Sequence, residues 1–117
     1  MRKLKSQNEL PPAMIVSMAE TKPELVKKMT HLYLDRETPR HLTEIKQAIA
    51  KQNAKGLKHS AHTLKGGSST LGTLGVVKVC RQLETKAKNQ DFADIEHLVQ
   101  LLEERYEEAR KELIKFL

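Results

Sequence analysis

Residues 53–72, NAKGLKHSAHTLKGGSSTLG, decide the fold. Within them an apolar or small residue recurs every three or four positions, which is the spacing of one face of an α-helix. These positions are Leu57, Ala61, Leu64, Ser68 and Leu71. Asn53 is a residue type that caps helix N-termini, and Gly72 is the type that most often ends a helix. The segment is therefore predicted to be one amphipathic helix that buries this face in a core.

Three other long segments repeat apolar residues at the same helical spacing. Helices are predicted over residues 23–51, 73–89 and 92–117. Pro39 lies inside the first of these, and a proline within a helix produces either a kink or a break into two helices. We favour a kinked continuous helix. A shorter helix is predicted in the apolar stretch AMIVSMA at residues 13–19.

The composition also favours an all-α fold. Aromatic residues make up only 3% of the chain, so strands would have little to pack with, whereas helix-forming Leu, Lys, Glu and Ala are plentiful. Short connections between amphipathic helices make neighbouring helices antiparallel. We predict an antiparallel up-and-down four-helix bundle with a short additional N-terminal helix. One domain at residues 11–117 would follow a polar, flexible segment at residues 1–10.

Several classes of protein are disfavoured by the composition. No apolar run approaches the roughly 20 residues of a membrane span, and the first residues lack the apolar core of a signal peptide, so a cytoplasmic protein is expected. Cys80 is the single cysteine, which excludes an internal disulfide and a cysteine metal cluster. The net charge of +6 fits nucleic acid or an acidic protein surface, but no basic run with interleaved aromatic residues is present.

His62 lies on the opposite side of its predicted helix from the apolar face. At about 100° per residue it points roughly 140° away from Leu57, and it should therefore face solvent. The same projection places basic and small residues around it: Lys55, Lys58, Lys65, Gly66 and Ser69. The histidine is thus predicted to stand in a basic, sterically open patch.

This arrangement suits an imidazole that carries a phosphoryl group. Neutral histidine has one ring nitrogen with a free lone pair, which can act as a nucleophile. Lys65, one turn further on, can pair with the negative charge of a phosphoryl group. Gly66 and Gly67 each cost a helix about 1 kcal/mol relative to alanine, and that cost suggests a use in letting a partner protein approach closely.

The run SAHTLKGGSSTLG at residues 60–72 resembles the signature of histidine-containing phosphotransfer (HPt) domains, H-x-x-K-G with a further glycine that ends the segment. The likeness extends over nearly the whole chain from Pro11 onward. The resemblance implies phosphorylation of His62 on its outer ring nitrogen, with the other nitrogen held by a polar side chain of the following helix. Glu84 stands where the family often has Gln or Glu. The implied function is relay of a phosphoryl group between His62 and a receiver-domain aspartate in a two-component phosphorelay.

The resemblance also implies the partners. These are receiver domains of response regulators or of hybrid sensor histidine kinases, and the docking surface would include Lys58, Gly66, Gly67 and Ser69. No kinase activity, cofactor, nucleic acid or membrane is expected, and the Mg²⁺ for transfer would belong to the receiver. Gly67 departs from the pattern, because many members have Ser or Ala there. A hydroxyl near the phosphoryl group would then come from Ser69 or from the partner.

Other interpretations of the same residues remain open. His59 and His62 lie three residues apart, as in some metal sites, but no third ligand is apparent. The segment GGSSTLG lacks the ending of a phosphate-binding loop. A non-catalytic helical adaptor with a basic binding face, or a fragment of a larger hybrid kinase, would share these features. A monomer is expected, whereas the cognate partners and the direction of transfer are not determined.

Overall fold

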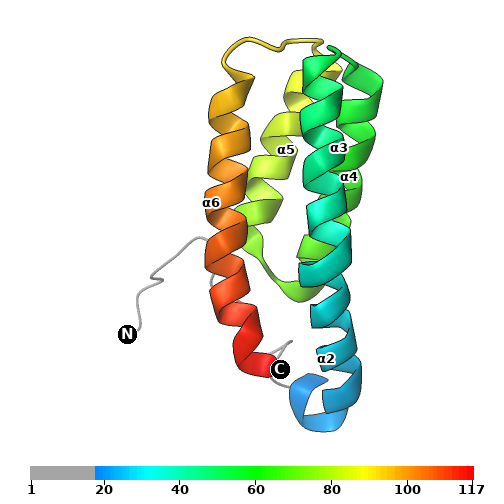
Figure 1. Cartoon of the computed structure of the whole chain (residues 1–117), viewed down its shortest axis with the longest axis vertical. Coiled ribbons are helices and arrows are strands. Elements are labelled where there is room, and N and C mark those ends of the chain that lie inside the picture. Colours follow the sequence, from blue (N-terminus) through cyan, green and yellow to red (C-terminus); the bar gives the residue numbers. More distant parts are fainter. Residues whose placement is uncertain (1–17) are drawn as a thin grey trace.

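The computed structural model describes residues 18–117, which form helices and short connections (Figure 1). Residues 18–21 are helical, while the predicted flexible segment 1–10 and most of the predicted helix at residues 13–19 lie outside the described residues. No strand occurs in the described part, so the all-α prediction is confirmed. None of the described helices is long and apolar enough to cross a membrane.

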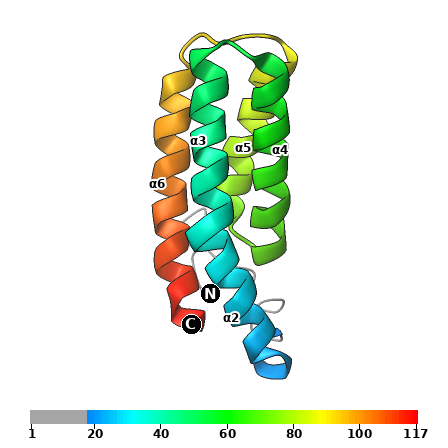
Figure 2. The ribbon, with the colours of Figure 1, turned by 45° about the vertical axis from the view of Figure 1, so that its right-hand side comes forward.

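Four helices stand side by side and antiparallel, and a fifth extends one of them beyond the end of the bundle (Figures 1 and 2). The four-helix bundle predicted from the sequence is therefore confirmed. In chain order the elements are α2 (Pro23–Leu32), a π-helical turn η1 (Tyr33–Glu37), α3 (Thr38–Ala50), α4 (Ala54–Leu71), α5 (Leu74–Lys88), α6 (Ile95–Leu113) and a 3₁₀ turn η2 (Ile114–Phe116). The bundle consists of α3, α4, α5 and α6, and α4 packs against both α3 and α5.

The chain stays helical from α2 through α3, as predicted, but the irregularity precedes Pro39. The N–H of Thr38 bonds to the carbonyl of Tyr33, five residues back, which makes this turn π-helical. The carbonyl of Leu34 would next accept from residue 39, where proline has no N–H to donate. The hydroxyl of Tyr106 on α6 donates to this carbonyl instead, at 2.8 Å. In Figure 2, α2 leans away from the axis of α3.

Both predicted ends of α4 are confirmed. The Asn53 side chain accepts a hydrogen bond from the N–H of Gly56 at 3.0 Å, so it caps the first turn. Gly72 ends the helix with φ of 77°, in the left-handed region that favours glycine. The predicted apolar face of α4 is buried throughout, at Leu57, Ala61, Leu64, Ser68 and Leu71.

Ser68 belongs to a buried polar cluster at the C-terminal end of α4. The Tyr33 hydroxyl lies 2.7 Å from the Ser68 hydroxyl and 3.1 Å from that of Thr73. Burial raises the pKa of Tyr33, an effect that the hydrogen bonds to Ser68 and Thr73 partly oppose. The cluster joins the π-helical turn to the end of α4, and it explains why a serine occurs in an apolar stripe.

The connection between α5 and α6 is longer than predicted. Asp91 accepts a hydrogen bond from the N–H of Ala93 at 2.9 Å, and the Lys86 ammonium donates to the Ala93 carbonyl at 2.5 Å. These contacts hold a turn in place, so α6 begins at Ile95 rather than near Phe92.

Candidate functional site

His62 lies on the exposed face of α4, where helical projection places it. Its side chain is 70% exposed, while the preceding residue, Ala61, is completely buried. The imidazole is held in place from one side, by α5. Its Nδ1 atom lies 3.1 Å from Oε2 of Glu84.

This contact determines which ring nitrogen of His62 carries the proton. An ionised carboxylate can only accept a hydrogen bond, so Nδ1 of His62 carries the proton that it donates to Glu84. In the neutral ring the other nitrogen, Nε2, then has the free lone pair. A histidine held in this way presents a nucleophilic nitrogen on an exposed side chain.

Glu84 also contacts Lys65. The Lys65 ammonium lies 2.6 Å from Oε1 of Glu84, so the two oxygens of one carboxylate face two different residues of α4. The side chains of Lys65 and Glu84 are 24% and 17% exposed, and this ion pair is therefore partly shielded from water. The structure thus brings together His62, Lys65 and Glu84, the three site residues predicted from the sequence and its family resemblance.

The electrostatics of the three residues are coupled. Partial burial alone would raise the pKa of Glu84, but the contacts with Lys65 and His62 outweigh this effect and hold the pKa below its usual value.

Cys80, one turn earlier on α5, is fully buried. Burial, and secondarily the charge of Glu84, raise the pKa of the Cys80 thiol to about 12, so this thiol is a poor nucleophile.

The glycine pair leaves space beside this cluster. A Cβ atom added at Gly66 would meet nothing within 4 Å, and one added at Gly67 would touch only Tyr33, at 3.8 Å. Packing within the bundle therefore does not require glycine at either position. Gly67 also borders a groove of about 220 Å³ between α2 and α4, whose lining includes Met29, Leu32 and Leu71.

The remaining predicted docking residues, Lys58 and Ser69, are exposed on α4. Sequence reasoning missed two further exposed cations, Arg81 and Lys88 of α5. They lie three residues before and four residues after Glu84, a spacing that places them on the same side of α5. This spacing is visible in the sequence, but it has meaning only once Glu84 is known to touch His62.

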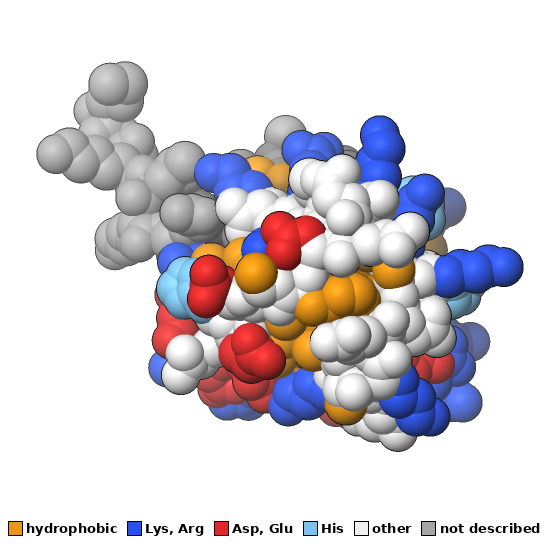
Figure 3. Space-filling model, turned by 90° about the horizontal axis from the view of Figure 1, so that it is seen from above, with side chains coloured by type: hydrophobic (Ala, Val, Ile, Leu, Met, Phe, Trp, Pro, Cys, Tyr) orange, Lys and Arg blue, Asp and Glu red, His pale blue; other side chains and the backbone are white. Residues whose placement is uncertain are grey.

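The charges of the molecule are unevenly distributed. Seen down the long axis, most acidic side chains lie toward the left, the side of α6 in Figure 1, whereas lysines and arginines project along the right and upper edges (Figure 3). The helix that carries His62 contains lysines and no acidic residue. The site therefore lies in positively charged surroundings.

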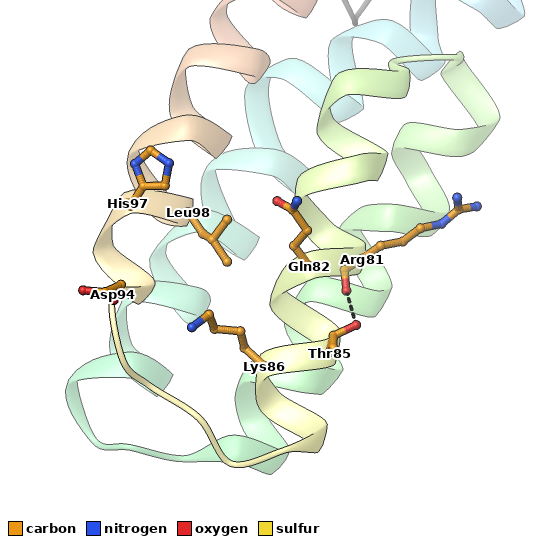
Figure 4. Close-up of a pocket in the computed structure, with 7 residues that line it drawn as sticks. All are labelled: Arg81, Gln82, Thr85, Lys86, Asp94, His97 and Leu98. Atoms are coloured by element: carbon orange, nitrogen blue, oxygen red, sulfur yellow. Dashed lines mark hydrogen bonds between the residues drawn. The ribbon is translucent and has the colours of Figure 1, made fainter.

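A groove lies elsewhere, between α5 and α6 (Figure 4). It has a volume of about 450 Å³, and its lining includes Lys86, His97 and Leu98. Lys86 is engaged by the loop that follows α5, through Asp91 and the Ala93 carbonyl. Among residues 18–117, no group of three His, Cys, Asp or Glu side chains could hold a metal ion. The α5–α6 groove is therefore separate from the cluster of His62, Lys65 and Glu84.

Comparison with known proteins agrees with this geometry. The family model of the Hpt domain matches residues 33–112. Among solved structures, the chain is similar to histidine-containing phosphotransfer protein B (HptB) of Pseudomonas aeruginosa, with 23% identity, a TM-score of 0.77, and coverage of 94% of this chain and 95% of that one. No curated protein sequence matches the chain. Because the family model spans most of the bundle, including His62 and Glu84, the chain belongs to the Hpt domain family, whose members are histidine phosphotransfer proteins of phosphorelays.

Proposed function

We propose that His62 is the residue that carries the phosphoryl group. The observation that supports this assignment is the exposed imidazole whose Nδ1 is held by Glu84 at 3.1 Å. Nε2 would attack the phosphorus of a receiver aspartyl phosphate, so that an N–P bond forms while the P–O bond to the aspartate breaks. The aspartate leaves as a carboxylate, and the reverse reaction regenerates the acyl phosphate.

Glu84 holds the ring in the orientation and tautomer that this attack requires. As the ring nitrogen bonds to phosphorus the imidazole gains positive charge, and a carboxylate at Nδ1 stabilises that charge. Lys65 supplies the complementary contact. It lies one turn from His62, and its ammonium would turn from Glu84 toward the phosphoryl oxygens, which carry close to two negative charges.

Gly66 and Gly67 provide access for the partner. Transfer between two proteins needs the phosphorus and the attacking nitrogen to come within about 3.5 Å, so the receiver loops must lie almost directly on α4. The absence of side chains one turn from His62 permits this approach. Lys58 and Ser69 complete the docking surface along the same helix.

The phosphoryl donor and acceptor are assigned to receiver domains of response regulators or hybrid sensor kinases. The chain itself is proposed to act as a relay without kinase activity, as a cytoplasmic monomer. The Mg²⁺ of the reaction is assigned to the receiver.

The test is transfer from a labelled, phosphorylated receiver of the same organism to the full chain and to two variants. His62→Gln should remain unlabelled, while His59→Gln, which removes another exposed histidine three residues earlier on α4, should be labelled like the wild type. The label should be acid-labile and stable to base, as expected of a phosphoramidate. Equal labelling of His62→Gln would reject the assignment, and no labelling of any form by several receivers would favour the adaptor interpretation.

A further inference from the structure

We propose that the α4–α5 face is an electrostatic docking surface for receivers with an acidic rim around the phosphorylated aspartate, and that Arg81 and Lys88 of α5 act in it together with Lys58 of α4. This inference rests on the proposed function and specifies its partner. It is supported by the distribution of charge, by the pairing of those charges and by their position around His62.

The two helices at the site differ in charge from the helix on the other side of the bundle. Seven cations lie on α4 and α5: Lys55, Lys58, Lys65, Lys78, Arg81, Lys86 and Lys88. Glu84 is the single acidic residue of these helices. In α6, by contrast, six glutamates outnumber three cations. A partner that approaches the His62 face therefore meets helices with more cations than carboxylates, whereas one that approaches α6 meets a helix with more glutamates than cations.

Most of the cations of α4 and α5 are not neutralised by neighbours. Elsewhere, Arg105, Arg110 and Lys46 form ion pairs with glutamates of α6. On α4 and α5 the lysines and arginines that form ion pairs within the described part of the chain are Lys65, with Glu84, and Lys86, with Asp91. The other five cations form no ion pair with residues 18–117. Isolated exposed charges of this kind add little to stability, so their concentration on these two helices is better explained by binding.

Four of the five unpaired cations, all except Lys78, lie around the histidine. Lys55 and Lys58 lie within about 40° of His62 around the axis of α4, by helical projection. Arg81 and Lys88 lie within about 60° of Glu84 around α5, and Glu84 contacts His62 directly. Figure 4 shows the Arg81 side chain pointing away from Asp94 and His97 of α6, although Arg81 is among the residues that line that groove. Its guanidinium therefore belongs to the exposed surface that flanks the site.

A protein with carboxylates around its phosphorylated aspartate matches this surface. Complementary charge speeds association by up to several orders of magnitude at low ionic strength, and it discriminates against partners with a basic surface. Single-stranded nucleic acid is the less suitable occupant, because its bases stack on aromatic side chains. Neither α4 nor α5 contains an aromatic residue.

The experiment measures phosphoryl transfer from a labelled receiver at several salt concentrations, for the full chain and for Arg81→Glu. The matched control is Lys111→Glu, which makes the same change of charge at an exposed position of α6. Arg81→Glu should lower the apparent second-order rate about tenfold at low salt through a higher KM, with an unchanged rate at saturating receiver. Lys111→Glu should stay close to the wild type, and salt should reduce the difference between the two variants.

The outcomes separate the docking surface from the proposed function. Normal labelling with equal rates for Arg81→Glu and Lys111→Glu would overturn the docking surface and leave the function of His62 intact. A wild type that takes no label from any receiver would overturn both. Tight binding of a DNA duplex or an RNA oligonucleotide that blocks transfer and is lost in Arg81→Glu would reassign the surface to nucleic acid.

Discussion

Glu84 is the residue on which the site converges, since one carboxylate contacts both His62 and Lys65. Glutamine at this position could still accept a hydrogen bond from Nδ1, but it would not neutralise Lys65 or stabilise positive charge on the ring. Glu84→Gln is therefore expected to retain phosphorylation at a reduced rate, and Glu84→Ala to lose about 10- to 100-fold, the typical effect of one charge-assisted hydrogen bond. Single-turnover transfer rates check this order, and identical rates for the two variants would contradict it.

The same carboxylate predicts a dependence of stability on pH. Because its pKa lies below the usual value in the folded state, Glu84 contributes stability that is fully present above its unfolded pKa of about 4.3 and is lost as the pH falls through the lower folded value. The difference in Tm between wild type and Glu84→Gln should therefore shrink between about pH 6 and about pH 3. The groups facing Glu84 are His62, Lys65 and Cys80. If the Tm advantage of the wild type over Glu84→Gln grew as the pH fell, the ionised form of Glu84 would destabilise the fold relative to its protonated form.

Lys65 is expected to matter more for the phosphorylated protein than for folding. Lys65→Ala should slow transfer or shorten the lifetime of the phosphohistidine by about 10-fold or more, because a charge-assisted contact to the phosphoryl oxygens is lost. The ion pair with Glu84 is only partly shielded from water, so its loss should lower the Tm modestly and leave the bundle folded. Lys55→Ala, which removes an exposed lysine of the same helix, is the control for the lifetime. An unchanged rate and lifetime in Lys65→Ala would reject the role.

At the scale of the helix, Gly66 lowers the stability of α4 but leaves space for the receiver to approach. A Cβ atom at this position meets nothing within 4 Å, so Gly66→Ala should stabilise the isolated protein by up to about 1 kcal/mol, the difference in helix propensity. Gly66→Leu should fold equally well but block docking, with transfer slowed far more than in Gly66→Ala. Thermal unfolding and transfer rates measured on both variants separate the two effects. Transfer at the normal rate in Gly66→Leu would refute the access argument.

The junction of α2 and α3 depends on a contact from α6. Tyr106→Phe would leave the Leu34 carbonyl without the hydroxyl that satisfies it, while the ring and its packing stay in place. The free energy of unfolding should fall by about 1–3 kcal/mol, which is the cost of a buried polar group without a partner. Equilibrium unfolding in denaturant measures this loss. A change below a few tenths of a kcal/mol would mean that water satisfies the carbonyl in the variant.

The helices differ in how closely their bounds follow from local sequence. Both ends of α4 are predicted correctly because Asn53 and Gly72 act through their own backbone and side chains. The start of α6 is predicted three residues early, because the Asp91 turn is completed by Lys86 from the preceding helix. The π-helical turn before Pro39 is missed for the same reason, since it is stabilised by Tyr106 from more than 70 residues away.

At the scale of the whole molecule, the sequence by itself determined the all-α class, the buried face of α4 and the outward direction of His62. These features depend on periodicity and on caps, which act within one helix. The family resemblance pointed to Glu84 as the partner of His62, but only the tertiary structure decided that the same carboxylate contacts Lys65, and that Arg81 and Lys88 share their side of the bundle. Those relations depend on how α5 is rotated against α4, and this rotation results from the packing of two apolar faces, which no single helix contains.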